Sequence, residues 1–179
     1  MPLTLTGSGT ITGINASGGL SSPQSNTVLQ VVQNEYSTQV SLSSTTYTDN
    51  GLTATITPKF STSRILILIS QNLYIYREFA FQYGNVRLLR NIPSTNTVVK
   101  DFAQVMNQTA GNPAGGSYPY HDLQSVVGLS YLDSPATTST ITYKMQHKVG
   151  TTSDGGTVIS QLGDYPSMIT LMELAAWLL

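Results

Sequence analysis

The segment Arg64-Ile65-Leu66-Ile67-Leu68-Ile69 contains five consecutive aliphatic residues after the arginine, and it decides the fold. Successive side chains of a β-strand point to opposite faces, so this run places large apolar groups on both faces of one strand. In an antiparallel sandwich only one face looks into the core, and we expect a neighbouring subunit to cover the other. At roughly 25 cal/mol per Å² of apolar surface, a wet second face would forfeit on the order of several kcal/mol per subunit.

The same prediction of burial applies to residues of this segment and to two tyrosines that follow it. We expect Ile65, Ile67, Ile69, Tyr74 and Tyr76 to lie in the core or in the subunit interface. One parity is expected to be buried within each subunit and the other between subunits, and the sequence does not assign the parities.

The aromatic residues that follow form two rows. Tyr74 and Tyr76 share one face, and after an irregularity at Arg77-Glu78 the side chains of Phe79, Phe81 and Tyr83 share another. Such rows fit a subunit interface, ordinary core or a stacking platform for sugar, and the three alternatives stay open.

Short runs of β-type residues continue on both sides, separated by turn signals at the spacing of an all-β sandwich or barrel. The expected strands are 28–33, 36–42, 52–57, 64–76, 85–91, 97–105, 124–132, 139–147, 157–162 and 167–174. The separators include 49–51, 91–94, 111–116, 133–135 and 153–156, which are rich in Gly, Pro, Asn and Asp. No helix is expected, except that the composition of 171–179 permits a helical end.

Residues 1–26 are rich in Ser, Thr and Gly and hold too few large apolar groups to bury a core. We therefore predict an N-terminal arm over 1–26 and one domain over 27–179. The arm alternates apolar and polar residues in the way short strands do, so it is expected to become ordered against a partner. Its apolar attachment residues are Leu3, Leu5, Ile11 and Ile14.

Charged residues make up only 9% of the chain and the net charge is −1, whereas charged residues are roughly 25% of ordinary soluble domains. Long-range attraction to nucleic acid or anionic lipid is therefore not expected. The absence of Cys excludes disulfides and thiol chemistry. No apolar leader and no membrane-spanning run is found, so we expect neither secretion by signal peptide nor membrane insertion.

The sequence offers little for catalysis or metal binding, and we predict no enzyme, no cofactor and no metal. A metal site wants three or more convergent ligands, but the two His, His121 and His147, are isolated. The alternative would place His121 and Asp122 around a trimer axis. The single Asp residues lie in turns, where a turn role explains them without a calcium ion. A glycosidase needs two carboxylates close together, and the nine acidic residues of the sequence show no such pair.

Four stretches resemble structural proteins of tailed bacteriophages, those of cyanobacterial and marine phages above all. They are YTDNGLTATITPKFSTSRIL at 47–66, YLDSP at 131–135, SMITLMEL at 167–174 and LTLTGSGTITG at 3–13. The resemblance implies an antiparallel jelly-roll sandwich similar to the tumour-necrosis-factor and complement globular-head domains, which associate about a threefold axis. It also implies a place on the virion, as tail fibre, head fibre or capsid decoration.

These observations predict a homotrimeric short fibre or tip protein of a phage virion, assembled in the host cytoplasm and released by lysis. The arm would bind another phage structural protein. A loop with Tyr118, Tyr120 and His121 is the candidate contact with a host glycan or receptor. The rivals are a trimeric capsid decoration protein, a carbohydrate-binding module and a glycan hydrolase on a similar fold.

Overall fold

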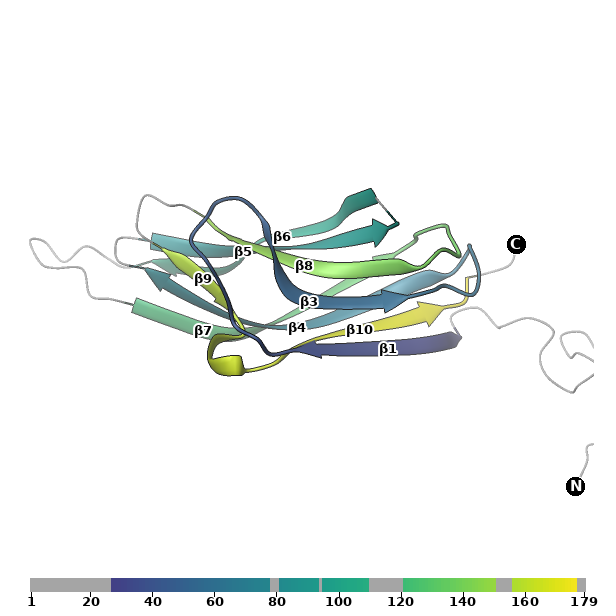
Figure 1. Ribbon diagram of the computed structural model, residues 1–179, viewed down its shortest axis with the longest axis horizontal. Coiled ribbons are helices and arrows are strands. Elements are labelled where there is room, and N and C mark those ends of the chain that lie inside the picture. The colour runs from purple at the N-terminus through teal and green to yellow at the C-terminus, as the bar shows by residue number, and fades with distance from the viewer. Residues whose placement is uncertain (1–26, 78–80, 94, 110–120, 151–155, 177–179) are drawn as a thin grey trace, which may run out of the picture.

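The computed structural model describes residues 27–77, 81–93, 95–109, 121–150 and 156–176, and most of them lie in β-strands (Figure 1). No helix among the described residues is long and apolar enough to cross a membrane. The strands are β1 (Val28–Tyr36), β2 (Val40–Leu42), β3 (Thr48–Ile56), β4 (Arg64–Arg77), β5 (Phe81–Ile92), β6 (Thr95–Thr109), β7 (His121–Asp133), β8 (Ile141–Val149), β9 (Thr157–Ser160) and β10 (Ser167–Leu174), with a short 3-10 helix η1 (Leu162–Asp164) before the last.

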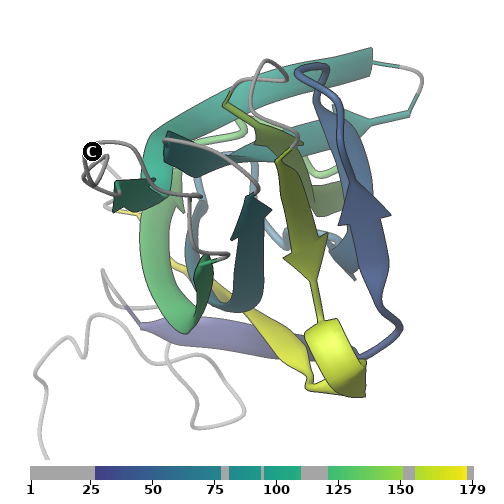
Figure 2. The ribbon, with the colours of Figure 1, turned by 90° about the vertical axis from the view of Figure 1, so that its left-hand side faces the viewer.

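The strand pairing is nested, and every pair is antiparallel. Strand β1 pairs with β10, β3 with β8, β4 with β7 and β5 with β6. Further pairs join these strands into a six-stranded sheet in the order β1-β10-β4-β9-β2, with β7 also paired to β4, and a four-stranded sheet in the order β3-β8-β5-β6. Figure 1 shows these sheets as two facing layers, and Figure 2 looks along them from the end that holds β9 and η1. Eight strands nested in two packed sheets define a jelly roll, so the predicted all-β jelly-roll sandwich is confirmed.

Two details of the sequence prediction were wrong. The strand expected over 36–42 is not continuous, because Tyr36 ends β1 and β2 covers only Val40–Leu42. The residues Asp49-Asn50-Gly51 were expected to separate strands, but they lie inside β3, where the register with β8 jumps from Asp49 to Thr53. This is a β-bulge, and Gly51 supplies the positive φ of 88° that it needs. The strand expected over 167–174 is confirmed as β10, so the helical end that the composition of 171–179 permitted is not formed in its described part.

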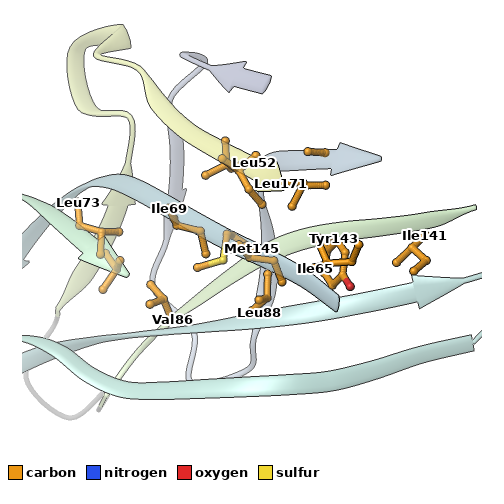
Figure 3. Close-up of a cluster of buried hydrophobic side chains, with 14 of the residues drawn as sticks. Leu52, Ile65, Ile69, Leu73, Val86, Leu88, Ile141, Tyr143, Met145 and Leu171 are labelled. Atoms are coloured by element: carbon orange, nitrogen blue, oxygen red, sulfur yellow. The ribbon is translucent and has the colours of Figure 1, made fainter. Parts of the chain in front are cut away.

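The core lies between the two sheets, and Figure 3 shows part of it. Strand β8 illustrates how it forms, because its side chains alternate strictly between buried and half-buried. Ile141, Tyr143 and Met145 are fully buried and meet Ile65 and Ile67 from β4. The alternation that the sequence shows in this strand therefore separates an inward face from a wet one.

A chain of buried polar side chains fills a gap in the ladder beside β4. Strand β10 pairs with β4 up to Ser70, and β9 pairs with it from Leu73, so Gln71 and Asn72 have no strand partner on that edge. Ser167 Oγ accepts from the backbone N–H of Asn72 and from Gln71 Nε2, each at 2.9 Å. Buried backbone groups must be satisfied, and this explains why the core is polar here.

His147 is the only titratable side chain in this polar cluster. Its Nδ1 lies 2.9 Å from Ser160 Oγ, its Nε2 has no hydrogen-bond partner among the described residues, and the ring is fully buried. The cluster continues through Asn50 and Gln71, which are neutral. Burial lowers the pKa of the imidazole from 6.5 to about 4, because a charged ring would have no counterion.

The two sheets are joined by an ion pair between a partly buried arginine and a buried aspartate. Arg90 on β5 donates to both carboxylate oxygens of Asp133 on β7 at 2.8 Å, and Tyr143 Oη on β8 donates to the same carboxylate at 2.6 Å. Asp133 is 5% exposed. A charge-assisted contact of this kind fixes the lateral position of one sheet on the other at the end where β4 begins.

A second buried carboxylate holds the connection between β3 and β4. Glu173 on β10 accepts from Ser63 Oγ at 2.6 Å and from the backbone N–H of Lys59 at 2.7 Å, and Gln30 Nε2 also donates to it. Burial alone would raise the pKa of Glu173, but these hydrogen bonds outweigh it and lower the pKa. The carboxylate therefore ties β1, β10 and the loop before β4 together.

The His147 environment predicts a loss of stability in mild acid. Because the folded-state pKa is depressed, the unfolded chain binds a proton first, and stability falls as the pH drops from 6.5 towards 4. Between pH 6.5 and about 5, where most carboxylates stay ionised, His147 should account for a loss of about 2 kcal/mol. Urea unfolding followed by circular dichroism measures it, and the variant His147→Gln should lack that slope. Equal slopes in both proteins would contradict the assignment.

Substitutions around the ion pair between the sheets should lower the free energy of unfolding by different amounts. Asp133→Ala leaves the partly buried Arg90 without its carboxylate and the buried Tyr143 hydroxyl without its acceptor, and it should lower the free energy of unfolding by about 3 kcal/mol. Tyr143→Phe removes one hydrogen bond to a charge and should cost about 1–2 kcal/mol. The control Asp49→Ala removes the exposed pair with Lys144 and should cost less than about 1 kcal/mol. Denaturant unfolding of the three variants tests the order.

Candidate subunit interface

Strand β4 divides its aliphatic residues between two environments. Ile65, Ile67 and Ile69 point inward and are 0%, 0% and 4% exposed, so the structure places all three in the core. Leu66 and Leu68 have the opposite parity; Leu66 is half-buried and Leu68 is 38% exposed. The single chain therefore covers one face of this segment and leaves apolar side chains on the other.

The outward side chains of neighbouring strands continue this apolar surface. Strand register aligns Val31 on β1, Met172 on β10, Leu66 on β4 and Leu132 on β7 in one row across the sheet. No charged residue interrupts the row. We call the surface around it the outer apolar face, and its members are Val28, Val31, Leu66, Leu68, Val126, Leu132, Met168, Met172 and Leu174.

Most of the exposed large apolar side chains gather there. Six of those found among the described residues belong to the outer apolar face, namely Val28, Val31, Leu68, Val126, Leu132 and Met168. The other three, Phe60, Val98 and Tyr165, lie elsewhere. Scattered apolar residues need no explanation, but a concentration on one sheet face marks a contact surface.

The outer face of the opposite sheet has a different character. Asp49 pairs with Lys144 at 3.0 Å, and Gln146 bridges Asp49 to Arg87. The ring of Tyr47 lies under Arg87 and Lys148, at 4.1 and 4.6 Å from its centroid, while its hydroxyl donates to Asp101. This polar face is suited to contact with water, so the two outer faces of the sandwich differ in polarity.

The other predicted interface residues lie further along β4. Tyr74 and Tyr76 share the outward parity with Leu66 and Leu68, and both are half-buried. At this end of the strand β9 replaces β10 as the neighbour, with Tyr74 opposite Ile159 and Tyr76 opposite Thr157. The structure thus separates the two tyrosines from the core isoleucines that the sequence grouped with them.

Several predicted residues fall outside the described part of the chain. These are the arm residues Leu3, Leu5, Ile11 and Ile14 and the loop residues Tyr118 and Tyr120. His121 opens β7, and its backbone lies opposite Arg77, but its side chain is outside the description. Among the described residues, no group of three or more His, Asp or Glu is placed to hold a metal ion.

One pair resembles enzyme chemistry and was not singled out in the sequence. Ser160 and His147 are hydrogen-bonded, as a nucleophile and its base would be. Both are 0% exposed and sit in the polar cluster beside β4. A substrate cannot reach the Ser160 hydroxyl in this fold, so the pair serves the packing of β9.

Comparisons with known proteins give a fold-level likeness alone. No protein-family model and no curated protein matches the chain. A crystal structure of the infectious bursal disease virus particle matches with a TM-score of 0.40 and 13% identity, and it covers 93% of this chain and 40% of the viral chain. The subviral particle of the same virus, formed by VP2, matches with a TM-score of 0.40, 12% identity and coverage of 93% and 42%. The chain spans about two fifths of the length of these structures.

The division of β4 predicts that two adjacent truncations act differently. Ile67→Ala opens a cavity in the core and should lower the free energy of unfolding by about 3 kcal/mol at any protein concentration. Leu68→Ala removes an outward group, so its effect should act through association and grow with protein concentration. Thermal unfolding over a range of concentrations measures both. A Leu68→Ala cost that equals that of Ile67→Ala at every concentration would contradict the assigned parity.

Proposed function

We propose that this protein is a non-enzymatic structural protein of a virion, which works as a homotrimer through its outer apolar face. The observation that carries the proposal is the uncharged row Val31–Met172–Leu66–Leu132, which crosses four strands of a sheet whose other side is already packed. A face of this kind gains free energy when it leaves water.

A second copy of the chain is the occupant that fits best. The partner surface must itself be poor in charge, and a neighbouring copy of this chain supplies such a surface without any further protein. In a closed threefold assembly the outer apolar face of each copy turns towards the axis, where it contacts a different part of its neighbour, and no apolar sheet remains open to further growth. The resemblance of the segments at 47–66, 131–135 and 167–174 to trimeric phage proteins supports three copies over two.

The virion role follows from the same properties. A jelly roll with two-sheet packing, buried clamps and little surface charge makes a rigid building block. The segment 1–26 would attach the trimer to another phage structural protein, with Leu3, Leu5, Ile11 and Ile14 as its apolar contacts. We propose that the assembled protein is a short fibre or tip that contributes to particle assembly and adhesion to the host surface.

Sedimentation equilibrium of the full chain tests the assembly. We expect a mass three times the 19.2 kDa of one chain. Val31→Asp and Leu132→Asp each place a charge in the apolar row and should give monomers that keep the β-sheet spectrum. Thr55→Asp is the matched control, since Thr55 lies on the polar face of the other sheet, and it should leave the mass unchanged.

The assembly proposal fails on either of two results. One is a wild-type chain that stays monomeric and folded over the whole concentration range. The other is a trimer that tolerates an aspartate at both row positions, because such a trimer would use another surface.

A further inference from the structure

A groove of about 320 Å³ opens on the polar face, on the side of the sandwich away from the outer apolar face. It forms where the bulge in β3 interrupts the pairing with β8. Its lining comes from β3, β5 and β8, and consists of Asp49, Gly51, Leu52, Thr53, Asn91, Thr142, Lys144 and Met145.

The bulge decides which atoms reach the groove. The register with β8 passes from Asp49–Gln146 to Thr53–Lys144, so the three residues between have no Cα partner across the ladder. The side chains of Leu52 and Met145 are fully buried in the core, and these two residues therefore offer backbone to the groove. A side chain in place of Gly51 would collide with the ring of Tyr36, which keeps the bulge free of a Cβ at this point.

The polar groups of the lining are held in place by one another. Asp49 and Lys144 form an ion pair at 3.0 Å, with side chains 47% and 27% exposed. The hydroxyl of Thr142 lies 3.0 Å from that of Thr55, and the Thr53 hydroxyl donates to the Tyr143 carbonyl at 2.9 Å. Such contacts orient the groups while the exposed carboxylate and hydroxyls keep free acceptor positions.

We propose that this groove binds a neutral sugar residue of a polysaccharide. One carboxylate and one ammonium cancel in charge, so the lining selects neither an anion nor a cation. A sugar hydroxyl both donates and accepts, and it can donate to Asp49 while it accepts from Lys144. The threonine hydroxyls and the Asn91 Oδ1 supply further acceptors, since the Thr53 hydroxyl donates to the Tyr143 carbonyl and Asn91 Nδ2 donates to Asn96.

The location of the groove suits a host contact. When the outer apolar face is enclosed in the trimer, the opposite sheet points away from the neighbour and its groove stays open to solvent. The site deepens the adhesive part of the proposed function and rests on it. It differs from the loop with Tyr118 and Tyr120, because it recognises hydroxyls by hydrogen bonds and has no aromatic residue in its described lining.

Saturation-transfer NMR of the full-length protein tests the site with the methyl glycosides of glucose, mannose, galactose and N-acetylglucosamine. We expect transfer to at least one of them, and titration should show at least a tenfold loss of affinity in Asp49→Asn, which unbalances the charge. Thr142→Val should weaken binding at least threefold. Thr140→Val is the matched control, since Thr140 bonds to Thr57 and lies outside the lining.

Sedimentation of the same samples separates this proposal from the assembly. A wild-type trimer that gives no transfer to any of the four glycosides overturns the sugar site and leaves the trimer standing. Transfer that persists unchanged in both Asp49→Asn and Thr142→Val also overturns it, because the sugar then binds elsewhere. A monomer that binds sugar in the groove supports the site and contradicts the assembly instead.

Discussion

Strand β4 carries aliphatic side chains on both faces, while a two-sheet sandwich encloses only one of them. Ile65, Ile67 and Ile69 meet the second sheet and become the centre of the core. Leu66 and Leu68 then have to point away, because successive residues of a strand alternate. Val31, Met172 and Leu132 on the neighbouring strands lie in register with Leu66, so one apolar row crosses the sheet, and the next outward row holds Gln33, Thr170 and Ser130 beside Leu68.

Polar groups that the fold buries are paired by hydrogen bonds inside the sandwich. Strand β4 is longer than β10, so β9 takes over as its neighbour and a gap opens at Gln71 and Asn72. Ser167 and the side chains around His147 satisfy the backbone there without any ionised group. The charged clamp of Arg90 and Asp133 lies at another place, where it bridges the two sheets. Hydrogen bonds therefore contribute to the packing at these two sites in addition to buried apolar surface.

The two outer faces of the sandwich differ in their chemistry. The sheet of β1, β10, β4 and β7 presents apolar rows, whereas the sheet of β3, β8, β5 and β6 presents ion pairs, hydroxyls and the groove beside Asp49. An assembly that encloses the first face necessarily displays the second.

The sequence by itself determined that the protein is an all-β sandwich, because alternation and turn residues are local properties of the chain. It located ten strands to within a few residues, including β10 at its observed bounds, and its errors fell between β1 and β2 and at the bulge of β3. The row of Val31, Met172, Leu66 and Leu132 was beyond its reach, since these residues come from strands far apart in sequence and meet only through register. Only the tertiary structure decided which parity of β4 faces inward, because the pattern of this segment is apolar at every position and the second sheet selects one side.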